Sequence, residues 1–211
     1  MGRAAPIRVP IFPLGGALLF PRAQLPLHIF EPRYRAMVRD ALGSDRLIAM
    51  IQPKDEAKVP RLFEIGCIGR IVASEELDDG RFNIVLEGVS RFRVAEEVQA
   101  STPYRQVDAD RSGFDDDAEP DPLASIQRAE LEREAKRYAD ALGYSVDWDA
   151  VGRLDDEMLV NGIAQIAPLD IGSKQALLEA DGVPRRADLL VQFMQFQRML
   201  PGGADGPETL Q

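Results

Sequence analysis

Few residues of this chain have side chains that could perform nucleophilic or metal chemistry. There is one cysteine, Cys67, and one histidine, His28, among 211 residues. One cysteine excludes an internal disulfide and a cysteine-based metal cage, and one histidine excludes two-histidine zinc sites and HExxH helices. A dyad of Cys67 and His28 is arithmetically allowed, but both residues lie in apolar runs that favour a buried thiol and a structural imidazole.

Other residue combinations that could catalyse a reaction are no stronger. Ser173 and Lys174 are neighbours in a helical segment, so their side chains point about 100° apart and cannot act as nucleophile and base. Carboxylate pairs at 75–76 and 155–156 lie among other charges, where neither acid is desolvated. No GxxxxGK[ST] phosphate-binding loop is present. The sequence therefore predicts no catalytic residue, no metal ligand and no cofactor, and hence a protein that is not an enzyme.

Charge is distributed unevenly along the chain. Residues 1–107 carry 15 Lys/Arg and 13 Asp/Glu, a balance of +2, whereas the remaining residues carry 10 and 22, a balance of −12. The segment 108–121 holds seven of these acids against Arg111 and is predicted to be a solvated acidic linker. The net charge of −10 would repel phosphate backbones, which argues against nucleic-acid binding.

The apolar content gives no indication of a membrane protein. No run approaches the roughly 18 consecutive apolar residues that a membrane-spanning helix requires. Pro10 and Pro13 interrupt the apolar N-terminus, which favours a buried strand there over a signal peptide. The single cysteine fits the reducing cytoplasm, which is the expected location.

The part of the chain before the acidic segment is predicted to be rich in β-strands. Residues 82–87 alternate Phe, Ile and Leu with Asn, Val and Glu, as a half-buried strand does. Asp79 and Gly80 predict a two-residue hairpin loop before that strand, and Pro32 and Gly43 enclose a predicted helix. The expected strands are VPIFPL, ALLF, PLHIF, RLIAMIQP, EIGCIGRIVASEEL, RFNIVLEGV, RFRVAEEV and YRQVDAD.

After residue 121 the apolar period becomes that of helices, and four amphipathic helices are predicted. Asp121 and Pro122 are expected to start the first, and the acids at 155–157 the second. The third is expected over residues 171–180. Extra apolar residues beside the main stripe of the fourth helix indicate either core or a dimer contact. This helix begins near Pro184, its stripe is Leu189, Phe193, Phe196 and Leu200, and Leu190 and Met194 lie beside it.

Four stretches resemble the N-terminal domain of the Lon protease family. Residues 11–38, IFPLGGALLFPRAQLPLHIFEPRYRAMV, follow the order of the family's opening: an apolar strand ending in Pro-Leu, a Leu-Phe-Pro, a Pro-Leu-x-Ile-Phe-Glu, and an Arg-Tyr that starts a helix. EIGCIGRIV, DGRFNIVLEGVSRFRV and IAPLDIGSKQALLEADGVPRRADLL resemble later segments of the same family, in the same order. Together these pieces cover most of residues 7–195.

The resemblance implies an α+β fold, with a PUA-like β-barrel followed by an α-helical bundle. The expected divisions are a barrel at 1–107, the acidic linker at 108–121, the bundle at 122–200 and a disordered tail at 201–211. In the family this domain recognises substrates and helps subunits to assemble. The chain resembles only this part, because it has no P-loop, no ATPase module and no peptidase domain.

The motif residues transferred by the resemblance are the candidate peptide-binding positions. Glu31 is expected at a strand-to-helix corner, where it caps the helix or pairs with an arginine at 33, 91 or 93, and its replacement by alanine is expected to lower stability. Gly88, Arg91 and Phe92 are expected to shape a second turn. The candidate groove or motif residues are Leu27, His28, Ile29, Phe30, Glu31, Arg33, Tyr34, Arg91 and Phe92.

Three classes of function remain open from the sequence. The leading one is a non-catalytic module, an adaptor in protein quality control, that binds unfolded or degron-bearing polypeptides through an apolar surface between barrel and bundle and by edge-strand pairing. A separate protease is a further candidate partner, and a monomer or weak homo-oligomer is expected. The second is RNA binding through arginines 33, 35, 39, 91 and 93. The third is a small-molecule site near His28 or Cys67.

Overall fold

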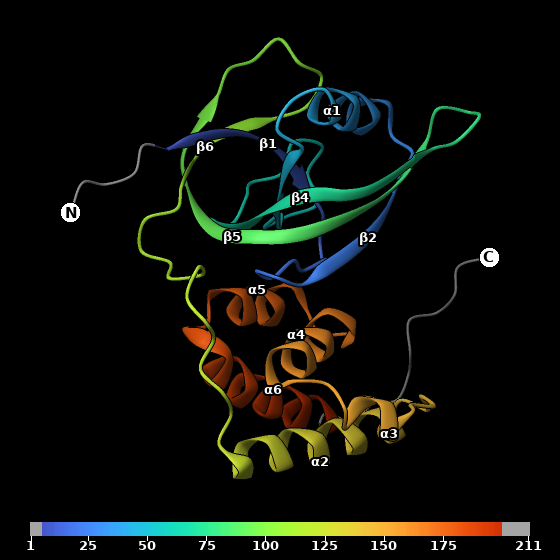
Figure 1. Ribbon diagram of the computed structural model, residues 1–211, viewed down its shortest axis with the longest axis vertical. Helices are drawn as coiled ribbons and strands as arrows, with labels where there is room; N and C mark the ends of the chain where they lie inside the picture. Colours follow the sequence, from blue (N-terminus) through green and yellow to red (C-terminus); the bar gives the residue numbers. More distant parts are fainter. Residues whose placement is uncertain (1–5, 200–211) are drawn as a thin grey trace. The chain divides into compact units, whose positions relative to one another are not determined.

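The computed structural model describes residues 6–199 and divides into two compact units. The first ends at Glu119 and contains all six strands and one helix, and the second begins at Pro120 and contains five helices of the described chain (Figure 1). The predicted change from strand to helix period is therefore present. The predicted disorder of the tail, 201–211, lies outside the described residues.

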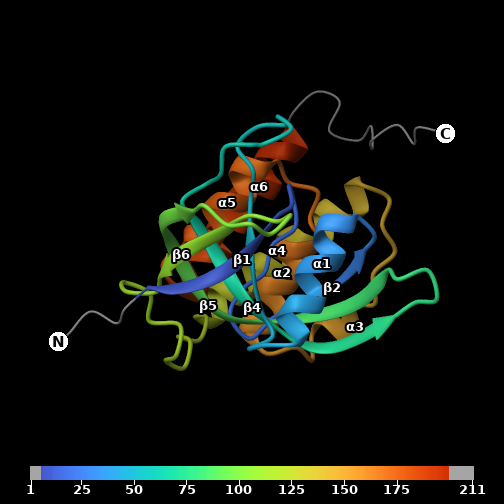
Figure 2. The same ribbon diagram turned by 90° about the horizontal axis from the view of Figure 1, so that it is seen from above.

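The first unit is built on a six-stranded mixed sheet, in the order β2-β5-β4-β3-β1-β6. Only the β1–β3 pair is parallel. The strand β6 pairs both with β1 and with the C-terminal part of β5. The series of paired strands β5-β4-β3-β1-β6 therefore ends beside the strand with which it began (Figure 2). The strands are β1 (Ile7–Pro13), β2 (Gln24–Ile29), β3 (Leu47–Ile51), β4 (Ile65–Glu76), β5 (Phe82–Val98) and β6 (Gln106–Asp110).

The strand β5 is one continuous element, and this corrects two sequence predictions. The runs RFNIVLEGV and RFRVAEEV were expected as two strands, with a turn shaped by Gly88, Arg91 and Phe92, yet all three residues lie inside β5. A Cβ atom at Gly88 would overlap the carbonyl oxygen of Phe20, so glycine is needed for a close backbone approach and not for a turn. The segment ALLF that contains Phe20 is buried but is not a strand. Leu19 of this segment packs at Gly69 of β4, and the backbone of Phe20 lies against Gly88 of β5.

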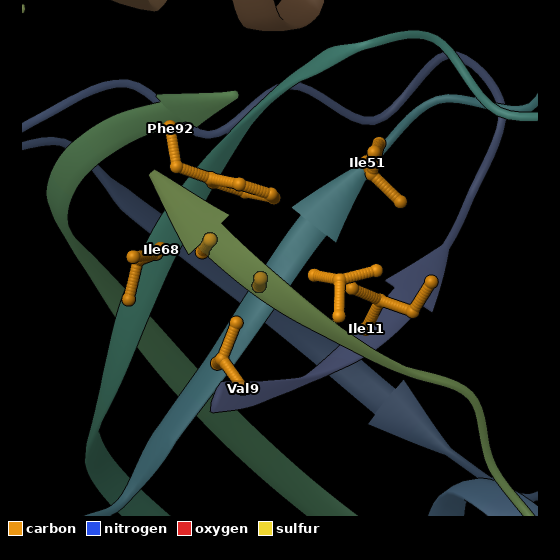
Figure 3. Close-up of a cluster of buried hydrophobic side chains, with 8 residues drawn as sticks. Val9, Ile11, Ile51, Ile68 and Phe92 are labelled. Atoms are coloured by element: carbon orange, nitrogen blue, oxygen red, sulfur yellow. The ribbon is translucent and has the colours of Figure 1, made fainter. Parts of the chain in front are cut away.

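The core of the sheet unit takes side chains from each strand around this closed path. Val9 and Ile11 of β1, Ile51 of β3, Ile68 of β4 and Phe92 of β5 converge on one interior (Figure 3). All five are at most 2% exposed. Because β-branched residues dominate, the strands' sequence preference and the packing favour the same structure.

The helix α1 (Pro32–Leu42) has the predicted limits. Pro32 occupies the first turn and Gly43 ends the helix. The loop after β5 is bound to this helix, because the Tyr104 hydroxyl donates a 2.7 Å hydrogen bond to Asp40 Oδ2. Burial and this hydrogen bond raise the pKa of Tyr104 to about 12.

The β4–β5 hairpin has a longer loop than predicted. Leu77 N donates to Arg81 O at 2.8 Å, which leaves residues 78–80 as a three-residue loop in place of the expected two-residue one. Gly80 has φ of +76°, and Gly80 N donates to Leu77 O at 2.8 Å. Asp-Gly thus marks the turn correctly, but with glycine as the left-handed residue that completes a longer loop.

The acidic segment is not the solvated linker that its composition predicts. Residues 108–110 belong to β6. Asp116 is 8% exposed and accepts hydrogen bonds from the Arg91 backbone N (2.7 Å) and from Arg91 Nη2 (2.8 Å). The Arg22 guanidinium donates to the Asp116 carbonyl, and Arg111 Nε donates to Ser90 Oγ at 2.7 Å. The segment therefore packs on β5, because its one buried acid neutralises a buried arginine.

The second unit places α6 at its centre. This helix packs against α2, α4 and α5. Asp147, Asp155 and Asp170 each accept a backbone hydrogen bond at the start of α3, α4 and α5. The first helix begins later than the predicted Asp121–Pro122, since Leu123 N donates instead to Asp156 Oδ2 at 2.8 Å. The helices are α2 (Ser125–Ala141), α3 (Trp148–Val151), α4 (Asp156–Ile166), α5 (Ile171–Glu179) and α6 (Gly182–Met199).

The buried face of α6 differs from the predicted one, although the helical period is correct. The predicted stripe is half-exposed or exposed at 189, 193 and 196, and residue 200 lies outside the described side chains. Arg186 lies on the true buried face and donates to Asn161 Oδ1 (2.7 Å) and Leu177 O (2.9 Å). A charged residue on this face conceals it from a hydrophobic pattern. The buried residues are Val183, Arg186, Ala187, Leu190 and Met194, which makes the last two core.

We predict that Asp116→Asn lowers the free energy of unfolding by about 3 kcal/mol, because it leaves the Arg91 charge buried without its counter-ion. Chemical denaturation of the full chain measures this. The matched control is Asp117→Asn, because the Asp117 side chain is 87% exposed and lies 3.9 Å from Arg111, and it should change stability by less than about 0.5 kcal/mol. Equal effects of the two variants would contradict the structural role of the buried pair.

We also predict that stability falls as the pH rises from about 10 to about 12. The unfolded chain ionises Tyr104 near its ordinary pKa of about 10, whereas the folded chain keeps its proton until about pH 12. Its contribution is therefore full below pH 10 and lost through that window. Denaturation midpoints measured against pH should show a smaller decline for Tyr104→Phe, and an identical decline would argue against the raised pKa.

Candidate functional site

The outer face of the strands β2, β5 and β4 carries polar and apolar residues in separate rows. The strand register aligns Pro26 with Val85 and Val85 with Ala73. One row further along, it aligns His28 with Asn83 and Asn83 with Glu75. The sheet thus presents an apolar row beside a polar row, and each row crosses three strands.

Hydrogen bonds fix the polar row. His28 Nδ1 lies 2.8 Å from Asn83 Oδ1, and Asn83 Nδ2 donates to Glu75 Oε2 at 3.0 Å. His28 Nε2 lies 3.1 Å from Arg81 Nη1. Since a guanidinium can only donate, Nε2 accepts, and the neutral ring therefore carries its proton on Nδ1 and donates to Asn83. Arg81 is itself held by Asp79 at 2.7 Å. The row is therefore pre-arranged before any ligand binds.

A wide, shallow groove of about 550 Å³ follows these rows. Polar side chains, apolar side chains and backbone atoms together form its floor. The groove is open to solvent. Such a surface suits an extended ligand with alternating side chains better than a compact molecule that requires enclosure. The lining residues are Pro26, Leu27, His28, Ala73, Ser74, Glu75, Asn83, Ile84 and Val85.

The strand β2 forms one border of the sheet, and its outer edge is not covered by another strand of the described chain. Gly88 N donates to Ala23 O, so the odd-numbered residues of β2 direct their backbone groups toward β5. Pro26 therefore faces the outer edge, where its missing N–H costs no hydrogen bond within the sheet. An added strand could pair with this edge on either side of Pro26.

Two of the nine sequence candidates line the groove, and a third lies beside it. Leu27 and His28 are groove residues. Phe30 is 61% exposed, and its ring lies 6.3 Å from that of His28 in a stacked arrangement. An exposed phenylalanine at the end of the groove extends its apolar surface.

Four candidates are buried and cannot contact a ligand in this conformation. Ile29 and Phe92 are core residues with 1% and 0% exposure. Tyr34 packs on Phe12, with ring centroids 4.3 Å apart, and burial raises its pKa. Arg91 is occupied by Asp116. These four motif residues thus serve packing and do not form a binding surface.

The remaining two candidates form the strand-to-helix corner. Arg33 Nη2 lies 2.9 Å from Glu31 Oε2 in an exposed ion pair. Glu31 occupies the N-cap position of α1 but its side chain makes no capping hydrogen bond. The predicted pairing with Arg33 is therefore present and the predicted cap is not.

The alternatives that rest on arginines or on the Cys67–His28 dyad find no support in the geometry. Carboxylates pair with four of the five arginines considered for RNA binding, namely Arg39 (Glu76, 2.7 Å), Arg93 (Glu64, 2.9 Å), Arg33 and Arg91, and Arg35 is the fifth. Cys67 is fully buried and contacts the Ile68 carbonyl, whereas both ring nitrogens of His28 have other partners. Within residues 6–199 no group of three acidic, cysteine or histidine side chains is arranged to hold a metal ion, and no helix has the length and hydropathy to cross a membrane.

Sequence reasoning missed the positions that complete the groove, on β5 and β4. The alternation in residues 82–87 did place Asn83 and Val85 on the outward face, and both lie there. Glu75 and Ala73 gave no such signal, because only the register of β4 against β5 brings them into the same rows.

Comparison with known proteins identifies the fold and the family. The family model of the ATP-dependent protease La (LON) substrate-binding domain matches residues 8–195. The chain belongs to this family. Lon protease 2 of Sorangium cellulosum is 29% identical over 207 residues, with 90% of this chain and 24% of that protein covered. Lon protease of Escherichia coli K12 is 25% identical, with 92% and 25% covered. The chain thus spans about a quarter of the length of these relatives.

Solved structures of Lon N-terminal domains show the same fold. The Lon N-terminal domain protein from Xanthomonas campestris has a TM-score of 0.62 and 22% identity, with 92% of this chain and 99% of that chain covered. The N-terminal domain of Mycobacterium avium complex Lon protease has a TM-score of 0.64 and 18% identity, with 90% and 98% covered. The family model of the Lon substrate-binding domain therefore extends over both units of this chain.

We predict that Glu31→Ala lowers the free energy of unfolding by less than about 1 kcal/mol, because it removes an exposed ion pair and no helix cap. Thermal or chemical denaturation measures the change. A loss above about 2 kcal/mol would show that Glu31 anchors the corner as the sequence alone suggested.

Proposed function

We propose that this chain is a polypeptide-binding module whose site is the groove on the outer face of β2, β5 and β4. The observation that carries the proposal is the apolar row through Val85, which runs beside a hydrogen-bonded polar row and next to an edge strand, β2, whose outer edge pairs with no other strand of the described chain. Membership of the Lon substrate-binding family supports a ligand of this class.

Two interactions would hold an extended segment there. The segment adds to the outer edge of β2 by backbone hydrogen bonds, which recognise any sequence. Its side chains on the groove side lie beside Pro26, and the larger ones extend over Pro26 toward Val85, so burial of this apolar area favours large hydrophobic residues. The polar row then contacts the backbone or polar side chains through Glu75 and Asn83. Such a site distinguishes exposed, extended chains from folded ones.

We further propose an architecture and a cellular role for this chain. The ring of strand pairings would be the PUA-like β-barrel, and the five helices the helical bundle of the family. The chain would act without catalysis of its own, as an adaptor in protein quality control that passes unfolded or degron-bearing clients to a separate protease. A cytoplasmic location stays a prediction from the cysteine content.

The test is the affinity for an unfolded probe, reduced and alkylated lysozyme carrying a fluorophore, measured by anisotropy. We predict that Val85→Asp weakens binding at least about tenfold, because a carboxylate in the apolar row must be desolvated when the segment binds. The matched control is Val59→Asp, since Val59 is 71% exposed on a loop away from the groove residues in sequence.

Native, folded lysozyme should bind neither to the unchanged chain nor to the two variants. Equal affinity of the Val85 and Val59 variants for the unfolded probe would contradict the proposed site. Denaturation midpoints of both variants, compared with the unchanged chain, establish that each is folded at the temperature of the assay.

A further inference from the structure

The helical unit contains a second cavity, of about 240 Å³, whose wall is almost entirely carbon. Its aromatic lining is Tyr138, Tyr144 and Trp148, and Leu159 and Met194 contribute aliphatic and sulfur surface. A polar ligand would lose its hydration here without gaining hydrogen bonds. Water gains equally little in a cavity without polar partners. The cavity is therefore suited to an apolar group, from a short aliphatic chain up to a single aromatic ring.

A glycine in the middle of α4 keeps this cavity open. Gly162 lines it, and apart from the helix's own backbone no heavy atom of the described chain lies within 4 Å of the place a Cβ would occupy. Gly162 is not among the residues with positive φ. Neither close packing nor conformation requires glycine, which destabilises a helix relative to alanine. Its structural effect is to preserve empty volume.

The surroundings of the cavity are apolar at its opening and acidic beyond it. Tyr144 and Ile166 line the cavity and are 55% and 79% exposed, so a bound group would cover apolar surface that water now contacts. The segment from Asp140 to Glu157, which supplies one wall, holds six acids and Arg153. One of these acids, Asp156, pairs with Arg128 of α2 at 2.7 Å, so five acids remain against Arg153. This local charge attracts a positively charged ligand and repels a negative one.

We propose that this cavity binds one bulky apolar side chain of a client polypeptide, such as phenylalanine or leucine, in a segment where lysine or arginine flanks it. This inference rests on the proposed function and deepens it, because it names the segment class and a second point of contact in the helical unit. The cavity recognises the apolar side chain by its volume, and the acidic segment recognises the flanks by charge.

The chain provides its own probe, since Trp148 is its single tryptophan and lines the cavity. The experiment titrates the full chain with a short, tryptophan-free peptide that has one phenylalanine between lysines, and follows Trp148 emission and its quenching by acrylamide. We expect a saturable emission change and reduced quenching. Peptides with serine in place of phenylalanine, or glutamate in place of the lysines, should bind at least about tenfold more weakly. The lysine preference should shrink with added salt.

The matched variants are Gly162→Leu, which fills the cavity, and Gly162→Ala, which leaves most of it open. Both should fold, because the position offers space and both residues favour helices more than glycine does. Gly162→Leu should lose the peptide response and Gly162→Ala should keep it. If Gly162→Leu does not fold, the quenching measurement on the unchanged chain still decides whether the peptide covers Trp148.

Several outcomes would overturn the inference without touching the proposed function. One is unchanged peptide affinity in Gly162→Leu, and another is no response of Trp148 while unfolded lysozyme still binds in a Val85-dependent way. An equal response to N-acetylphenylalanine amide would indicate a small apolar ligand instead. A change in Trp148 emission with protein concentration, in the absence of peptide, would indicate that a second copy of the chain occupies the cavity. If the unchanged chain does not bind unfolded lysozyme at all, the proposed function is refuted as well.

Discussion

The sheet unit depends on a single strand, β5, that must satisfy three neighbours. Its N-terminal part pairs with β2, its C-terminal part with β6, and most of its length with β4. The preceding chain crosses it at Gly88, where a side chain would collide with the backbone of Phe20. If β5 ended at that point, the groove face and the core with Phe92 would lose their common support. This constraint explains why one strand runs for 17 residues.

The same strand connects the groove with the interior. Its alternation sends Ile84 and Leu86 inward, while Asn83 and Val85 reach the outer rows. A groove built in this way is rigid, because its floor is the reverse side of a packed core. Specificity then depends on side chains that the strand holds in place, and little on loop movement.

Local chemistry predicted much of this structure, and long-range pairing accounts for the parts it did not predict. Pro32 and Gly43 set the limits of α1, and alternation gave the outward face of β5, because both signals lie within a few residues. The burial of Asp116 could not be read from composition, since its partner is 25 residues earlier. The face of α6 was missed because Arg186 is buried with Asn161, and the register of β4 decides the groove's far side.

The buried contact between Arg91 and Asp116 also determines where the chain can be divided for study. The last strand of the sheet ends at Asp110, and a fragment cut there would look complete by its secondary structure. Such a fragment would retain Arg91 in the interior and discard the acid that neutralises it. A fragment that contains the isolated sheet unit therefore has to extend beyond Asp116. The solubility of a shorter fragment would be a poor guide to the native unit.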